Sequence, residues 1–293
     1  MQLDSAQLTA LASILRLGSF DAAAAALGVT PSAISQRVKA LEDRVGTTLV
    51  LRGQPCTGTP TGQRLAKHAE DVALLEAQAL GVSGNTSPRR LRLAVPADVL
   101  ATWLIPALAQ VPEMLFDLMI DDQDTSADWL RRGEVSAAMS GQARAAPGCD
   151  VLALGALRYH ATASPAYVER WFADGVTAET LARAPMLTFN QKDQLQGRWL
   201  MQKIGQRLTP PSHHLPSSHG FVAAAREGLG WGMNPAPLVT EHMEMGRLVS
   251  LDEALPLDVP LYWQVARIMA PALAPLTAAI RAAAREALVQ EAR

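Results

Sequence analysis

Residues 30–46 read Thr-Pro-Ser-Ala-Ile-Ser-Gln-Arg-Val-Lys-Ala-Leu-Glu-Asp-Arg-Val-Gly, and the stretch carries the signals of a short helix with its start and its end. Thr30 can cap the amino end, Pro31 suits the first turn, and Gly46 can terminate the helix. Apolar residues at steps of four, three and four form one face: Ile34, Val38, Leu41 and Val45. The other face carries side chains that suit base edges and phosphates: Ser32, Ser35, Gln36 and Lys39. Taken alone, the pattern describes an amphipathic helix, and most such helices only pack.

The segment before this helix changes the interpretation. An apolar stripe from Leu8 to Leu17 predicts a first helix that ends at Gly18. A second short helix then runs from the candidate cap Ser19 to Gly28, and a four-residue turn joins it to the helix at 30–46. The order helix, turn, helix is the layout of a DNA-binding helix-turn-helix.

A β-prone segment at 47–52, a turn at 53–55 and a returning segment at 56–61 predict a wing, with Arg52 near its tip. Residues 31–67 hold six Lys and Arg against two acidic residues, a local charge of +4 in a chain whose total is −2. Such a surplus fits phosphate contacts, although an ordinary solvated helix face gives the same count. The helix-turn-helix and the wing together favour DNA binding over an ordinary solvated face. The DNA-binding residues that we expect are Thr30, Pro31, Ser32, Ser35, Gln36, Arg37, Lys39 and Arg52.

The same segments resemble the N-terminal signature of LysR-type transcriptional regulators. The resemblance covers about sixty residues and rests on these motifs: Gly18-Ser19-Phe20, the Ala-rich run to Leu27, Val29 to Gln36, Leu41-Glu42, Gly46, Leu49, Arg52 and Thr59-Pro60-Thr61-Gly62. Two departures are Gly53-Gln54-Pro55-Cys56, where many members have an Arg-rich wing, and the very Ala-rich second helix. The resemblance implies a regulator that binds double-stranded DNA as a homodimer or homotetramer, with RNA polymerase as a further partner.

Length and composition bound the rest of the molecule. The 293 residues suit two or three domains, and 49% hydrophobic with 18% charged residues is typical of a globular chain. No apolar run approaches the ~18–20 residues that span a bilayer, and we find no secretion signal. Cys56 and Cys149 form neither a disulfide framework nor a metal-binding spacing, and the six His show no HExxH pattern. We therefore expect a cytoplasmic protein without a metal or cofactor and without a membrane partner.

A linker helix is expected from Thr61 to about Val82. Six of its residues follow a three-four alternation that is typical of a two-stranded seam: Leu65, His68, Val72, Leu75, Ala79 and Val82. In the family such a helix pairs two subunits, and the simpler alternative is a helix packed on its own domain. Residues 81–88 read as a hinge.

From Arg90 the pattern alternates between strands and helices, which predicts an α/β domain with helices over a mostly parallel sheet. The expected strands lie at 91–95, 115–120, 135–139, 186–189, 230–234 and 261–266. The expected fold is thus an all-α winged helix-turn-helix with a long linker helix, followed by an α/β effector domain like the periplasmic binding proteins. Its expected parts are the DNA-binding domain at 1–60, the linker helix and hinge at 61–86, and the effector domain at 90–293. The latter divides into sub-domain I (90–162 and 264–293) and sub-domain II (163–263).

Ligands of such folds lie in the crevice beyond the carboxyl ends of the strands. This rule selects loops of both lobes, where serines at a helix start suit a carboxylate and acidic loops suit a cation. Asp residues in such loops also serve as helix caps or solvated charges, and Trp263 suits a core position equally well. The candidate effector-binding residues are Ala97, Asp98, Asp122, Asp124, Ser140, Asn190, Asp193, Ser217, Ser218 and Trp263.

A closer resemblance points to the subfamily of LysR-type regulators that sense lysine and arginine and control basic amino-acid export. It rests on Ala97 to Pro106, Leu130 to Val135, Leu154 to Leu157, Ser217-Ser218 with Phe221-Val222, and Leu261-Tyr262-Trp263. A different small-molecule effector and a nucleoid-type DNA-binding protein remain alternatives. An enzyme is a third, but the sequence shows no nucleophile elbow, P-loop or dinucleotide glycine pattern.

Overall fold

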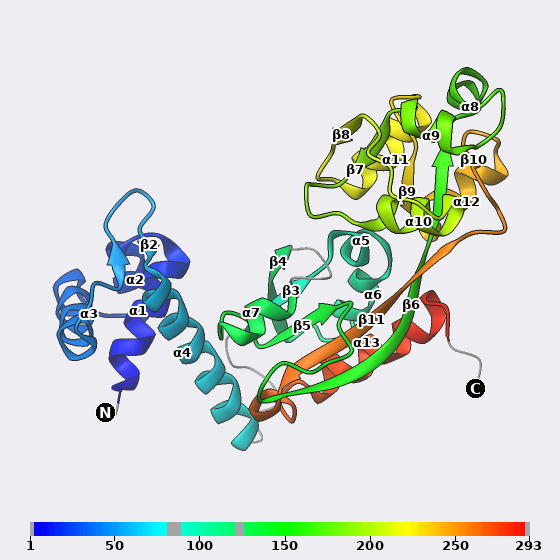
Figure 1. Cartoon of the computed structure of the whole chain (residues 1–293). Helices are drawn as coiled ribbons and strands as arrows, with labels where there is room; N and C mark the ends of the chain where they lie inside the picture. Colours follow the sequence, from blue (N-terminus) through cyan, green and yellow to red (C-terminus); the bar gives the residue numbers. More distant parts are fainter. Residues whose placement is uncertain (1–2, 81–88, 121–125, 291–293) are drawn as a thin grey trace.

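The structure is a computed structural model that describes residues 3–80, 89–120 and 126–290. Figure 1 shows an N-terminal helical domain, a long helix that leaves it, and an α/β domain of two lobes. This is the winged helix-turn-helix, linker helix and two-lobed effector domain that the sequence predicts. None of the helices in the described ranges has the length and apolar content that a membrane crossing needs.

The N-terminal domain follows the sequence signals closely. It contains α1 (Ser5–Leu17), α2 (Phe20–Leu27), α3 (Pro31–Val45), β1 (Val50–Leu51) and β2 (Thr57–Gly58). The three helices end at glycines with left-handed backbone angles, which suit a residue without a side chain. Buried apolar residues from all three helices and the first wing strand form one core, including Leu11, Ala23, Ile34 and Val50. The helix-turn-helix is confirmed, and the wing is a short two-stranded hairpin.

Helix α4 (Pro60–Ala79) begins where the wing ends. The Thr59 hydroxyl accepts a hydrogen bond from the Gly62 amide over 3.1 Å and caps the first turn. A Cβ atom at Gly62 would lie 2.0 Å from the Leu49 carbonyl oxygen, so only glycine permits this approach of α4 to the wing. At its other end, Leu74 is buried in the core of the α/β domain. Part of the apolar surface of α4 is therefore buried against its own chain.

The first lobe packs helices on the parallel end of the sheet. Its elements are β3 (Arg89–Val95), α5 (Ala97–Val99), a π-helical turn (Leu100–Leu104), α6 (Ile105–Leu108), β4 (Met114–Ile120), α7 (Ser126–Arg131), β5 (Ala137–Ser140) and α13 (Ala274–Ala287). Strand β3 pairs in parallel with β4 on one side and with β5 on the other. These elements agree with the sequence-based expectation.

Two long antiparallel strands connect the lobes, β6 (Cys149–Ala163) and β11 (Leu257–Ala266), which Figure 1 shows running from one lobe to the other. The sheet order is β10-β6-β11-β5-β3-β4, with β9 also paired to β6. All pairs that involve β6 or β11 are antiparallel. The expectation of a mostly parallel sheet is therefore wrong. The sheet is mixed because β6 and β11 run antiparallel to each other between the lobes.

The second lobe gathers the remaining elements around the far end of β6. They are α8 (Pro165–Trp171), α9 (Ala178–Arg183), β7 (Met186–Thr188), α10 (Leu195–Ile204), β8 (Ser212–His214), α11 (Ser218–Arg226), β9 (Gly232–Pro235), α12 (Ala236–Glu244) and β10 (Val249–Ser250); a short 3-10 helix (Arg267–Met269) follows β11. Strand β11 already pairs with β5 of the first lobe at Tyr262–Val265. The sub-domain division at residues 162 and 264 stays a prediction.

Candidate functional site

Helix α3 presents the expected polar surface. Ile34, Val38 and Leu41 are buried in the N-terminal core, which fixes the opposite face of the helix toward the outside. Ser32, Gln36 and Lys39 are exposed, whereas Ser35 and Arg37 are half-buried. The Thr30 hydroxyl accepts from the Ala33 amide over 3.2 Å, and Pro31 occupies the first turn. An exposed amide and an ammonium on one helix face are the groups that read bases and bind phosphates in a major groove.

The wing is held against α3 by a carboxylate. Glu42 Oε1 accepts hydrogen bonds from the Leu49 amide at 2.7 Å and the Val50 amide at 3.3 Å. The exposed Arg52 guanidinium stacks over the Phe20 ring of α2, 5.2 Å from its centroid. These contacts place a cation of the wing beside the helix-turn-helix, where it extends the positive surface.

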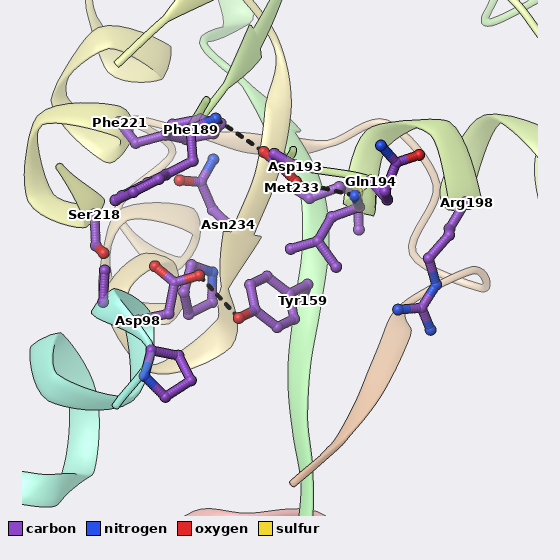
Figure 2. Close-up of a pocket in the computed structure, with 14 residues that line it drawn as sticks. Asp98, Tyr159, Phe189, Asp193, Gln194, Arg198, Ser218, Phe221, Met233 and Asn234 are labelled. Carbon is purple, nitrogen blue, oxygen red and sulfur yellow. Dashed lines mark hydrogen bonds between the residues drawn. The ribbon is translucent and has the colours of Figure 1, made fainter. Parts of the chain in front are cut away.

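A pocket lies between the two lobes, with walls from β3–α5, β6, α10, α11 and β9 (Figure 2). Its lining residues are Pro96, Ala97, Asp98, Tyr159, Phe189, Asp193, Gln194, Leu195, Arg198, Ser218, Phe221, Met233, Asn234 and Pro235. Aromatic and aliphatic side chains share the lining with carboxyl, hydroxyl, amide and guanidinium groups. That composition suits a small molecule with an apolar body and charged ends.

Asp98 is the carboxyl group that the first lobe contributes. It follows strand β3 directly, and the Tyr159 hydroxyl of β6 donates a hydrogen bond to its Oδ2 over 2.8 Å (Figure 2). Burial raises the pKa of the Asp98 carboxyl and the Asp193 charge adds to this rise, while the hydroxyls of Ser218 and Tyr159 lower it. A positively charged ligand beside this half-buried carboxyl would offset the cost of ionising it.

Asp193 has a different task. Its two oxygens accept from the amides of Phe189 over 2.8 Å and of Leu195 over 3.0 Å, which fixes the loop before α10 (Figure 2). The carboxylate thus places the start of α10, and two residues there line the pocket: Gln194, which precedes the helix, and Arg198, which lies in it. Both of these side chains are exposed.

Helix α11 begins at the pocket. The Ser217 hydroxyl accepts from the Gly220 amide over 3.1 Å and caps the helix, while Ser218 lies in the first turn and lines the pocket. Gly232 lets the Phe221 ring of this helix close on β9, because a Cβ atom there would lie 2.4 Å from Phe221 Cε1. The amino end of α11 therefore faces a site that already contains a hydroxyl, an arrangement that suits a carboxylate.

The pocket brings together Ala97, Asp98, Asp193 and Ser218 of the expected residues. Four others lie outside its lining. Ser140 is fully buried and bonded to Gln264, Asn190 accepts from the Lys192 amide, and Ser217 serves as a cap. Trp263 is buried and its indole donates to the Thr277 hydroxyl of α13, so it belongs to the core of the first lobe. Asp122 and Asp124 lie outside the described residues.

Several lining residues were not among the expected ones. Some lie in segments that the sequence had indicated, and others do not. Phe189, Phe221, Asn234 and Pro235 belong to segments that the strand-end rule or the family resemblance had selected, whereas Tyr159, Gln194, Leu195, Arg198 and Met233 do not. Tyr159 lies inside β6, Leu195 and Arg198 lie in α10, Met233 lies in β9, and Gln194 directly precedes α10. A rule that examines only strand ends passes over such positions.

The two parts of the chain match two family models. Residues 5–63 match the bacterial regulatory helix-turn-helix protein, lysR family, and residues 84–285 match the LysR substrate binding domain. The HTH-type transcriptional regulator LysG of Mycobacterium tuberculosis is 45% identical over 286 residues, which cover 97% of this chain and 94% of the relative.

Two solved structures resemble the chain over nearly its whole length. The crystal structure of ArgP from Mycobacterium tuberculosis has a TM-score of 0.80 at 43% identity, and the match covers 99% of this chain and 100% of that chain. Full-length LysG from Corynebacterium glutamicum with bound effector Arg has a TM-score of 0.67 at 38% identity and covers 98% and 99%.

Proposed function

The chain belongs to the LysR family of bacterial helix-turn-helix regulators, and from this membership we propose that it senses lysine or arginine and controls genes of basic amino-acid export or metabolism. One observation carries the choice of an amino acid as the ligand. The half-buried Asp98 lines the pocket between the lobes beside Ser218 of α11, and burial raises the pKa of its carboxyl. In this proposal Asp98 holds an ammonium group, and Ser218 with the amino end of α11 holds the carboxylate.

The apolar part of the pocket supports the same class of ligand. Phe189, Phe221 and Met233 line it together with the charged groups. Methylene groups of a lysine or arginine side chain gain by contact with such walls. The relatives named LysG and ArgP, one of them solved with arginine, add to this choice.

The regulatory mechanism that we propose is a change in the balance of two states. The ligand binds between lobes that are joined by β6 and β11, so it favours the arrangement that fits it better. Because α4 contacts both the DNA-binding domain and β3, a change in the first lobe alters the position of the DNA-binding heads. We further propose that α4 pairs two chains, in a homodimer or a homotetramer. The proposed protein acts in the cytoplasm, with RNA polymerase as a partner and without enzymatic activity.

Calorimetry of the full-length protein with lysine, arginine, leucine and glutamate tests the ligand. We expect binding of lysine or arginine, and a large loss of affinity in Asp98→Asn, which keeps the shape of the side chain and removes its charge. Asp174→Asn, at an exposed position outside the pocket lining, is the matched control because it makes the same substitution away from the ligand and should leave the affinity unchanged. Binding of glutamate or leucine in place of the cations points to another effector and leaves the family membership intact.

A further inference from the structure

Asn234 of β9 is a fully buried amide in the wall of the pocket that the proposed mechanism does not yet use. Its backbone lies opposite His160 in the pairing of β9 with β6, so the second lobe holds it firmly. In the view of Figure 2 its amide lies between Phe189 and Asp98.

The hydrogen bonds fix which way the amide points. Its nitrogen donates to the Thr162 hydroxyl over 2.9 Å and to the Gly232 carbonyl oxygen over 3.3 Å. A carbonyl oxygen can only accept, so the nitrogen must face Gly232 and the remaining atom is the oxygen Oδ1. This oxygen is buried and finds no donor within the ranges that the structure describes.

A buried acceptor without a donor is costly, and native proteins rarely keep one without a reason. A ligand with an N–H group would supply the missing donor at this wall. We propose that Asn234 is a specificity-determining residue whose Oδ1 accepts a hydrogen bond from the α-ammonium of the effector, opposite the carboxyl of Asp98. This assignment rests on the proposed function, because it presumes an amino acid in the pocket.

The choice of the α-ammonium follows from the surroundings of Asp98. The α-ammonium and the carboxylate of an amino acid are attached to one carbon, so their binding groups must be neighbours. Ser218 at the start of α11 and Asp98 line the same pocket, and Figure 2 shows them beside each other. Acceptors beside the carboxylate-binding end of the pocket therefore face the α-ammonium, while the side-chain cation lies farther away.

The test compares two ligands on the full-length protein by calorimetry. Lysine carries both amino groups, and 6-aminohexanoate is the same molecule without the α-amino group. Wild-type protein should bind lysine at least tenfold more tightly than 6-aminohexanoate. Asn234→Ala should weaken the binding of lysine by about tenfold or more and leave the binding of 6-aminohexanoate nearly unchanged. The ratio of the two affinities should therefore fall.

Thr162→Val is the matched control, because it removes an acceptor from the nitrogen side of the same amide and leaves Oδ1 in place. It should keep the preference for lysine, and circular dichroism checks the fold of both variants. The inference is wrong if Asn234→Ala keeps the full ratio, or if it weakens both ligands equally, which would assign Asn234 to the side-chain end. Equal binding of the two ligands by wild type also refutes it, even if the variant does not fold. If wild type binds neither lysine nor arginine, the proposed function itself fails.

Discussion

The Ser136 hydroxyl donates a hydrogen bond to Asp71 Oδ1 over 2.7 Å, and this bond joins helix α4 to the first lobe of the effector domain. The other carboxylate oxygen of Asp71 pairs with Lys67, one turn earlier on α4. Ser136 precedes β5 and is buried, and its backbone amide bonds to the Arg92 carbonyl of β3. Strand β3 leads directly to Asp98, so one strand connects the pocket with the contact to α4.

This contact yields a stability prediction. Asp71→Ala leaves the buried Lys67 without its partner and should destabilise the protein by about 3–5 kcal/mol. Ser136→Ala removes one hydrogen bond to a charged group, at a cost of roughly 1.5–3 kcal/mol. Urea unfolding followed by circular dichroism measures both.

The half-exposed pair of Arg158 and Asp258 provides the control for this comparison. Asp258→Ala breaks an ion pair that solvent screens, so it should cost only about 0–1 kcal/mol. Equal losses for Asp71→Ala and Asp258→Ala would mean that the contact between α4 and the first lobe contributes no special stability.

A second prediction concerns base recognition by α3. Gln36 is exposed on the face opposite the buried Ile34 and Val38, so its amide is available to a base edge. Gln36→Ala should lose about 1–3 kcal/mol on the preferred operator and little on unrelated DNA. Lys39→Ala should instead weaken all sequences alike and reduce the salt dependence of binding. Titrations of both variants with specific and random duplexes measure these losses, and a uniform loss for Gln36→Ala would show that it does not read bases.

The DNA-binding domain was predictable because its signals are local. A cap, an apolar period and a terminating glycine all occur within one helix, and Thr30 and Gly46 act in the structure as the sequence suggests. Asp98 and Ser218 were predictable for a related reason. The end of a strand and the start of a helix mark where a pocket of this fold lies.

Strand β6 and its Tyr159 were harder to predict. The pairing of β6 with β11 shifts register opposite Gly155, between Leu261 and Tyr262, and so breaks the period-two pattern. Gly155 has a φ of +119°, and a Cβ atom there would lie 2.7 Å from the Val289 carbonyl oxygen. Its conformation thus depends on the C-terminal segment, more than a hundred residues away, which no local pattern reveals. Trp263 was also hard to assign from the sequence. A tryptophan in a strand gives the same sequence pattern whether it lines a pocket or lies in a core.

A third prediction concerns assembly through α4. Leu65 and Leu75 of the expected seam pack partly against the cores of their own chain, so charges there would disturb the fold itself. Val72 is half-buried and belongs to neither core, which makes it the better probe. Val72→Glu should lower the mass measured by light scattering and weaken operator binding. Gln78→Glu adds the same charge at an exposed position of the helix and should leave the mass unchanged, and an unchanged mass for both variants would remove α4 as an interface.

The last prediction uses the raised pKa of Asp98. Burial raises the pKa of this carboxyl above 3.8, so the folded protein disfavours the ionised form. Asp98 contributes stability that is complete below its ordinary pKa and is lost as pH rises through its pKa in the folded protein.

A bound cation reverses this dependence because it favours the carboxylate. Affinity for lysine should therefore fall as pH is lowered through the pKa of Asp98, by up to about tenfold per pH unit below it. The gain in Tm that lysine gives should shrink in parallel over the same pH range. In Asp98→Asn both effects should disappear, because an amide does not titrate in this range. Calorimetry and thermal unfolding at several pH values measure the two trends, and an affinity of wild type that stays constant on acidification would show that Asp98 does not pair with the cation.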